Sequence, residues 1–174
     1  GTKITSAIPL KDSGNYKNMS FGSNATFSKD NTIGTFLNSE YLTSGTYLTS
    51  KQVNMIEDNT TWYLGTVGNA SYKLAKYQDT TGSNLTKSTT TAKIGLLRMG
   101  ELMAGQFAKN GNSYWTLTPT GYGYVHYVGD GAIGSNGMNP TNPDGSRPSM
   151  NLKSTVKIVS GTGTKFDPFQ LSVN

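Results

Sequence analysis

The feature of this sequence that most restricts its fold is a long polar segment, residues 120–146, set between two apolar stretches. The flanking stretches, 114–119 and 147–152, are interpreted as β-strands. The segment between them consists almost entirely of Gly, Tyr, Asn, Asp, Ser and Pro, a composition that is typical of antibody recognition loops. We therefore expect a scaffold of strands that displays a recognition surface, and not a catalytic one.

Composition favours a single β-rich domain, 1–174, with long loops. The apolar fraction is 34% and the charged fraction 14%, so neutral Thr, Ser, Asn and Gly must cover much of the surface. Ten Tyr, six Phe and two Trp supply large side chains for a core. High net charge with few aromatic residues, which is typical of disorder, is not present.

The absence of cysteine excludes disulfides, thiol nucleophiles and thiolate metal sites. A Thr- and Asn-rich chain without cysteine fits the exterior of a Gram-positive type of bacterium, so an extracellular location is expected. The net charge is +5, but the lysines are scattered singly and form no nucleic-acid-binding run. They are read as a solvated surface, with attraction to an anionic cell-wall polymer as the alternative.

No apolar stretch reaches the roughly 20 residues of a membrane helix, and no signal peptide opens the chain. Because the sequence begins abruptly at Gly1, it is expected to be an ectodomain cut from a longer precursor. No contact with a membrane is expected within this fragment.

Local patterns predict short helices and many strands, an α+β architecture. Helices are expected after Asp30-Asn31, over the capping box at Thr49 and Gln52, and over 99–104 with a stop at Gly105. A loop is expected over 12–28 and a mobile loop over 79–91. Strands are expected over 4–10, 60–67, 72–77, 93–98, 114–118, 122–128, 132–135, 149–152, 156–159 and 169–173. From residue 114 onward the strands are expected to form one β-meander, with a hairpin turn at 130–131.

Several motifs in the carboxy-terminal half resemble a known but uncharacterised domain family. They are the runs 93–102, 114–119, 147–153, 161–165 and 167–169. In this order they resemble a domain of bacterial surface proteins and type IV pilin-like proteins, over about residues 32–171. That family is in turn similar to the C-type-lectin-like fold of formylglycine-generating enzymes and of retroelement variable proteins.

The resemblance implies a C-type-lectin-like fold in which the stretch between the Trp115 strand and the Arg147-Pro148 strand forms the ligand-facing loops. The chain departs from the family in carrying Ser146 before Arg147, where Val is usual. It also lacks the catalytic cysteines of the formylglycine enzymes, so their activity is not implied.

Candidate ligand-binding residues follow from the loop. If 122–128 is a strand, Tyr122, Tyr124 and His126 share one exposed face that can stack on a sugar or pack on a protein. The alternative is that these residues only cover the core. The full candidate set is Tyr122, Tyr124, His126, Tyr127, Asp130, Asn136, Asn139 and Asn142.

Oxygen-bearing side chains in the same loop raise the question of calcium. Asp130 and Asp144 are the weak candidates for metal ligands, but the spacing does not match an EF-hand, and turn formation is the favoured interpretation of the Asn and Asp residues. No cofactor is otherwise expected. His126, the single histidine, is not part of a convincing catalytic triad, and no carboxylate pair supports glycoside hydrolysis, so an enzyme is not expected.

The sequence thus predicts a non-catalytic, adhesin-like module of the bacterial surface or pilus that binds a glycan or protein through residues 120–146. The alternative is a structural, pilin-like subunit of a surface filament that contacts other pilin subunits and has no specific ligand.

Overall fold

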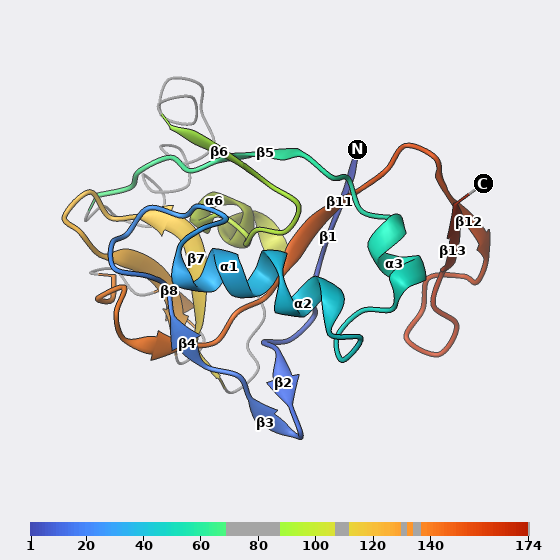
Figure 1. The fold of residues 1–174 in the computed structure, drawn as a ribbon, viewed down its shortest axis with the longest axis horizontal. Helices are drawn as coiled ribbons and strands as arrows, with labels where there is room; N and C mark the ends of the chain where they lie inside the picture. Colours follow the sequence, from blue (N-terminus) through green and yellow to red (C-terminus); the bar gives the residue numbers. More distant parts are fainter. Residues whose placement is uncertain (69–87, 107–111, 130–131, 134–136, 174) are drawn as a thin grey trace.

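A computed structural model describes every residue except 69–87, 107–111, 130–131, 134–136 and 174. In the described part the fold is α+β, with short helices and many antiparallel strands in small sheets (Figure 1). The expected α+β class is confirmed. No helix in these ranges combines the length and apolar character needed to cross a lipid bilayer.

The helices begin at the capping residues that the sequence marks. Asn31 Oδ1 accepts a hydrogen bond from Gly34 N at 2.8 Å, and Thr49 and Gln52 form the reciprocal capping box. Both predicted starts are confirmed, but the predicted stop at Gly105 is wrong because a π-helical turn continues past it. The segments are α1 (Thr32–Asn38), α2 (Glu40–Thr43), α3 (Ser50–Asn54), α6 (Met99–Glu101) and the π-helical η1 (Leu102–Gln106).

The strands pair in six small antiparallel groups among the described residues. The central sheet has the order β7-β8-β9, which confirms the first part of the predicted meander. The hairpin predicted at 130–131 lies outside the described residues, but Gly129 pairs with Ala132 on either side of it. The strands of this central sheet are β7 (Tyr114–Pro119), β8 (Val125–Gly129) and β9 (Ala132–Ile133).

Beyond β9 the expected meander is wrong for the next two strands, which pair with distant segments, although the last two strands pair with each other. β11 (Ser149–Leu152) pairs with β1 (Thr2–Thr5), and β10 (Pro143–Asp144) pairs with β4 (Met19–Ser20). Through these two pairs, the amino-terminal 20 residues pack against residues 143–152. Periodicity marks a strand but not its partner, which is why the meander was expected.

Several strand boundaries also differ from the prediction. The first strand is Thr2–Thr5 and not 4–10, and β5 (Thr60–Tyr63) stops well before residue 67. β6 (Thr89–Ala92) occupies part of the expected loop 79–91; the rest of that loop, apart from Ser88, lies outside the described residues, as does the strand expected at 72–77. Threonine-rich sequence therefore formed a strand where composition alone indicated a loop.

The expected strand 93–98 is buried but is not a strand. Its backbone bonds go to three different neighbours: the Asn38 side chain accepts from Ile94 N, Gly95 forms a single bridge with Ser149, and Leu97 O accepts from Leu117 N. The apolar pattern correctly indicated burial. It could not indicate that no single strand would pair with the whole segment.

A hairpin occupies part of the loop expected over 12–28. β2 (Lys11–Asp12) and β3 (Asn15–Tyr16) are joined by Ser13 and Gly14, both at positive φ. Positive φ at both central residues is the geometry of a tight hairpin turn. The Ser-Gly pair is a weaker signal of that turn than Asn-Gly, so the hairpin was missed.

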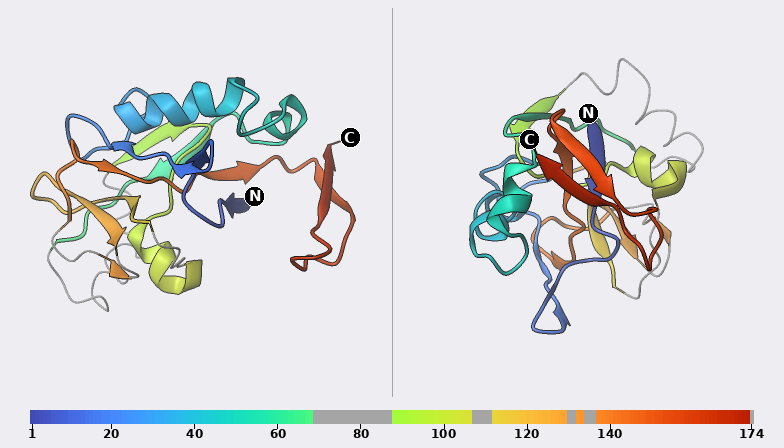
Figure 2. Two further views of the ribbon diagram at one scale, coloured as in Figure 1. Left: turned by 90° about the horizontal axis from the view of Figure 1, so that it is seen from below. Right: turned by 90° about the vertical axis from the view of Figure 1, so that its right-hand side faces the viewer.

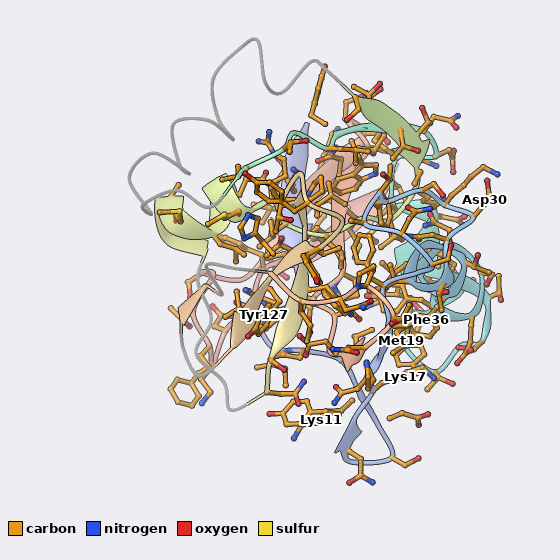
Figure 3. The ribbon with its side chains drawn as sticks, turned by 90° about the vertical axis from the view of Figure 1, so that its left-hand side faces the viewer. Lys11, Lys17, Met19, Asp30, Phe36 and Tyr127 are labelled. Atoms are coloured by element: carbon orange, nitrogen blue, oxygen red, sulfur yellow. The ribbon has the colours of Figure 1, made fainter. Side chains whose placement is uncertain are left out.

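The core is built around the aromatic side chains of the amino-terminal half and of β7. Phe21 contacts Trp115 edge to face with ring centroids 5.6 Å apart, and Trp62 is buried as predicted. Figure 3 shows Met19 and Phe36 on one side of the molecule and Tyr127 on the other. All three pack in or against the same hydrophobic cluster.

Arg147, in the Arg-Pro motif, holds the start of β11 in place. Its side chain is buried, its Nε donates to Ser6 O at 2.9 Å, and its guanidinium lies over the Tyr114 ring at 5.1 Å. This residue therefore joins the amino-terminal strand, the central sheet and β11. Its role in the fold is structural.

The carboxy-terminal hairpin, β12 (Val156–Ser160) and β13 (Gln170–Val173), projects from the rest of the molecule (Figures 1 and 2). Its two strands and the turn expected over 161–165 are present. The buried hydrophobic residues all lie between Phe21 and Leu152 in the described chain, so the hairpin contributes none of them.

Candidate functional site

The connection between β7 and β8 is a short loop, Thr120 to Tyr124, that displays two tyrosines. Gly121 and Gly123 both have φ of 84°, a conformation that glycine adopts readily and that lets the chain turn tightly between the two antiparallel strands. Thr120 N donates to Tyr124 O at 2.9 Å and closes the loop. Tyr122 is 70% exposed and Tyr124 is 43% exposed, so the loop offers aromatic surface to solvent.

The base of this loop is fixed by its neighbours. Pro119 O accepts a hydrogen bond from Val67 N at 3.0 Å, and Val125 exchanges two backbone hydrogen bonds with Met138. Gly137, which precedes Met138, packs directly against Thr120 at the start of the loop. A Cβ at position 137 would lie 2.5 Å from Thr120 Cγ2. The two exposed tyrosines therefore stand on a backbone held from two sides.

The predicted strand over 122–128 begins only at Val125, because Gly123, at positive φ, interrupts it. As a result, the shared exposed face of Tyr122, Tyr124 and His126 does not exist. Both tyrosines project from the loop, whereas His126 lies within β8 and is 1% exposed.

His126 has a structural environment. Its Nε2 lies 2.8 Å from Val67 O, and its own carbonyl accepts from Thr116 Oγ1 at 2.7 Å. The expectation that the His126 side chain lies on an exposed face is therefore wrong. The alternation of residues around a single histidine does not indicate which face of the strand is buried by the rest of the fold.

Tyr127 occupies an intermediate position. It is half-buried in β8, pairs with Trp115 across the sheet and packs against the main core cluster (Figure 3). Only part of its ring is open to solvent. Its removal would disturb the core as well as any ligand contact.

The remaining candidate residues lie in the turn that precedes β10 or outside the described chain. Asn139 is exposed, and its Oδ1 accepts from Thr141 N at 3.0 Å, so its side chain forms the turn. Asn142 is exposed and its backbone N donates to Asn139 O. Asp130 and Asn136 are not among the described residues.

Asp144 was considered as a metal ligand, but it is a buried part of the fold. Its Oδ1 accepts from Ser113 Oγ and from Gly145 N, and its Oδ2 is buried with no hydrogen-bond partner. Burial raises the pKa of the Asp144 carboxyl to about 6, although the hydrogen bonds from Ser113 and Gly145 act to lower it. A lone carboxyl group of this kind does not make a calcium site.

In the described ranges, His, Asp and Glu side chains form no group of three or more that could hold a metal ion. The surface around the loop offers aromatic rings, amides and hydroxyl groups. Such groups can stack on a ligand and form hydrogen bonds with it.

Comparison with known proteins adds no relative: no family model matches the chain, and neither a curated protein nor a solved structure shows a significant match. The resemblance noted from the sequence therefore rests on its own motifs. The function must be argued from the geometry of the described residues.

Proposed function

We propose that the protein is a non-catalytic recognition module of the bacterial cell surface or pilus, with a C-type-lectin-like fold, that binds a glycan or a protein. The contact surface is the loop between β7 and β8 with its two exposed tyrosines, together with the nearby Asn139 and Asn142. The observation that carries this proposal is the exposure of Tyr122 and Tyr124 on a backbone fixed at both ends.

Tyrosine suits this role for physical reasons. It buries a large area when it meets a partner, loses little conformational freedom, and keeps a hydroxyl group for hydrogen bonding. The tight turns of the loop restrict the backbone before binding, which lowers the entropy cost of forming a complex. Because the loop carries no charge, selectivity would come from shape and hydrogen bonding.

The order of motifs supports the C-type-lectin-like part of the proposal. Trp115 lies in β7, the displayed loop follows, and Arg147 and Pro148 lead into β11. The resemblance implies this order. The cysteine-free, Thr- and Asn-rich composition supports the extracellular location.

The proposal is tested by probing an array of printed glycans and an array of purified extracellular-matrix proteins with the labelled chain. For any ligand found, the double variant Tyr122→Ala/Tyr124→Ala is expected to weaken binding at least about tenfold, since each ring contributes on the order of 1 kcal/mol beyond its buried area. Tyr127 is left unchanged because it supports the core.

Phe166→Ala is the matched control, because Phe166 is 94% exposed and belongs to the carboxy-terminal hairpin, at the other end of the molecule (Figure 1). It should leave binding unchanged. Equal affinity of the double variant and the original chain for the same ligand would refute the assignment of the loop as the contact surface.

A further inference from the structure

The strand β1 lies at the edge of its sheet, with β11 as its only strand partner among the described residues, at the end of the molecule that carries the carboxy-terminal hairpin. In β11, Ser149 exchanges both backbone hydrogen bonds with Gly95, and Asn151 O accepts from Glu57 N. These peptide groups therefore point away from β1. In an antiparallel pair the residues opposite them, Thr5 and Lys3, must also point their N–H and C=O groups away from β11.

These outward groups have no backbone partner among the described residues. Thr2, Lys3 and Ile4 are exposed and Thr5 is half-buried, so the edge is open to solvent. An exposed edge of this kind is a template for another strand. It offers two donors and two acceptors in the spacing of a β-ladder.

Hollows lie on both faces of this edge strand. Thr2 and Ile4 face a groove of about 810 Å³ that the hairpin completes with Ile158, Phe169 and Leu171. Lys3 and Thr5 line a smaller hollow of about 480 Å³ with Leu97 and Glu101, and Ile4 borders both hollows. An added strand would thus find space for its side chains on each side.

The groove on the hairpin side is apolar and basic. Ile158 is 58% exposed and Phe169 is 50% exposed there, an unusual amount of open apolar surface for two strands of a soluble fold. The charged side chains that line it in the described chain are Lys153 and Lys157. Lys153 lies 3.5 Å from the Asp58 carboxylate, whereas Lys157 has no carboxylate within ion-pair distance among the described residues.

We infer that β1 accepts an extended segment of another polypeptide as an added strand, with apolar side chains in the hairpin groove and an acidic side chain beside Lys157. The backbone edge selects an extended chain, the groove selects alternate apolar residues, and the lysines select negative charge. This surface lies at the opposite end of the molecule from the tyrosine loop (Figure 1).

A second copy of the chain is a poorer occupant. The strands that border the groove, β1 and β12, carry Lys3 and Lys157 and no acidic residue. Pairing two copies through these strands would bring like charges together, in a chain whose net charge is already +5. Edge lysines of this kind oppose self-association.

The inference is tested by fluorescence anisotropy with a synthetic peptide labelled at its amino terminus, fluorescein-Glu-Glu-Val-Thr-Val-Thr-Val-Glu-Glu-amide. Binding is expected for this peptide and not for the version with Lys in place of Glu. Methylation of the backbone nitrogens should abolish binding when it falls on one alternate set of residues and spare it on the other, because only one set faces β1.

Two pairs of variants locate the site, and each pair combines a substitution in the groove with a control outside it. Ile158→Ser is expected to weaken peptide binding about tenfold, while Val159→Ser, at a residue that is 62% exposed and does not line the groove, leaves it unchanged. Lys157→Glu is expected to weaken it by about tenfold at low salt, while Lys165→Glu, outside the groove, has little effect. All four residues are exposed, so the fold should be retained.

Three results would overturn the inference. One is the absence of binding at any concentration at which the peptide is soluble. Another is binding that neither alternate set of methyl groups affects, which would indicate apolar contact without strand pairing. The third is self-association of the chain in sedimentation that Ile158→Ser abolishes, which would make a second copy the occupant.

Discussion

Single side chains join segments of this protein that lie far apart in sequence, and Asn38 is the clearest case. At the end of α1, its Nδ2 donates to Gly34 O at 2.9 Å and to Ile94 O at 3.0 Å. Its Oδ1 accepts from Lys93 N and Ile94 N. One amide group therefore satisfies four backbone groups and replaces the strand partner that Lys93 and Ile94 lack.

Replacing Asn38 with Ala is expected to lower the free energy of unfolding by about 3 kcal/mol, because backbone groups at the junction lose their partners. Chemical denaturation would measure the loss. Asn38→Asp keeps the shape and the acceptor but removes both donors, so it should be destabilising as well. A loss below about 0.5 kcal/mol for the Ala variant would contradict this role.

Asp144 predicts a pH dependence of stability. Its pKa is raised in the folded protein to about 6, from an ordinary value of 3.8, so the folded state holds the proton more tightly than the unfolded chain does. The Asp144 contribution therefore favours folding below about pH 4 and is lost as the pH rises through 6.

Asp144→Asn removes this titration and leaves a neutral group of the same shape. Relative to the original chain, the variant is expected to gain about 3 kcal/mol of stability at pH 7.5, which is the equivalent of the rise in pKa from 3.8 to about 6, and far less at pH 4. Urea denaturation at several pH values would measure this difference. A constant difference across that range would show that Asp144 does not titrate as its burial implies.

At the scale of elements, local signals were reliable where a local interaction decides the structure. The two helix starts depend on Asn31, Thr49 and Gln52, which act within three residues of their own position. The loop tyrosines were likewise found from composition. What could not be predicted was the face of β8 that the fold covers, because Val67 and Thr116 lie far from His126 in sequence.

The capping box gives a direct test at this scale. Thr49→Ala is expected to destabilise the protein by about 1 kcal/mol, since Gln52 N loses its acceptor at the start of α3. Thermal melts would measure the change. Thr46→Ala, at an exposed position in the preceding turn, is the matched control and should shift the melting temperature far less.

At the scale of the whole molecule, the sequence indicated the α+β class and most strands from Tyr114 onward but not the way the chain closes on itself. Pairing of β1 with β11 and of β4 with β10 depends on long-range packing, and neither appears in a periodicity. The candidate site was predicted in part for the same reason: exposure is a property of the assembled fold.

The arrangement of the core predicts that the carboxy-terminal hairpin is dispensable for folding. A chain that ends at Ser154 keeps every buried hydrophobic residue of the described structure, so its melting temperature should fall by no more than about 5 °C. Circular dichroism would measure this. Loss of cooperative unfolding would show that the hairpin supports β1 and β11, and Phe166→Ala serves as a surface control.

The closing pair of strands also sets a condition on biosynthesis. Thr5 and Ser149, neighbours in that pair, are 144 residues apart in sequence. At ribosomal speeds the first strand waits on the order of ten seconds for its partner to be made. The pairing of β1 is therefore expected to follow synthesis of β11. Because so distant a contact is slow to form, refolding should take milliseconds to seconds, not microseconds.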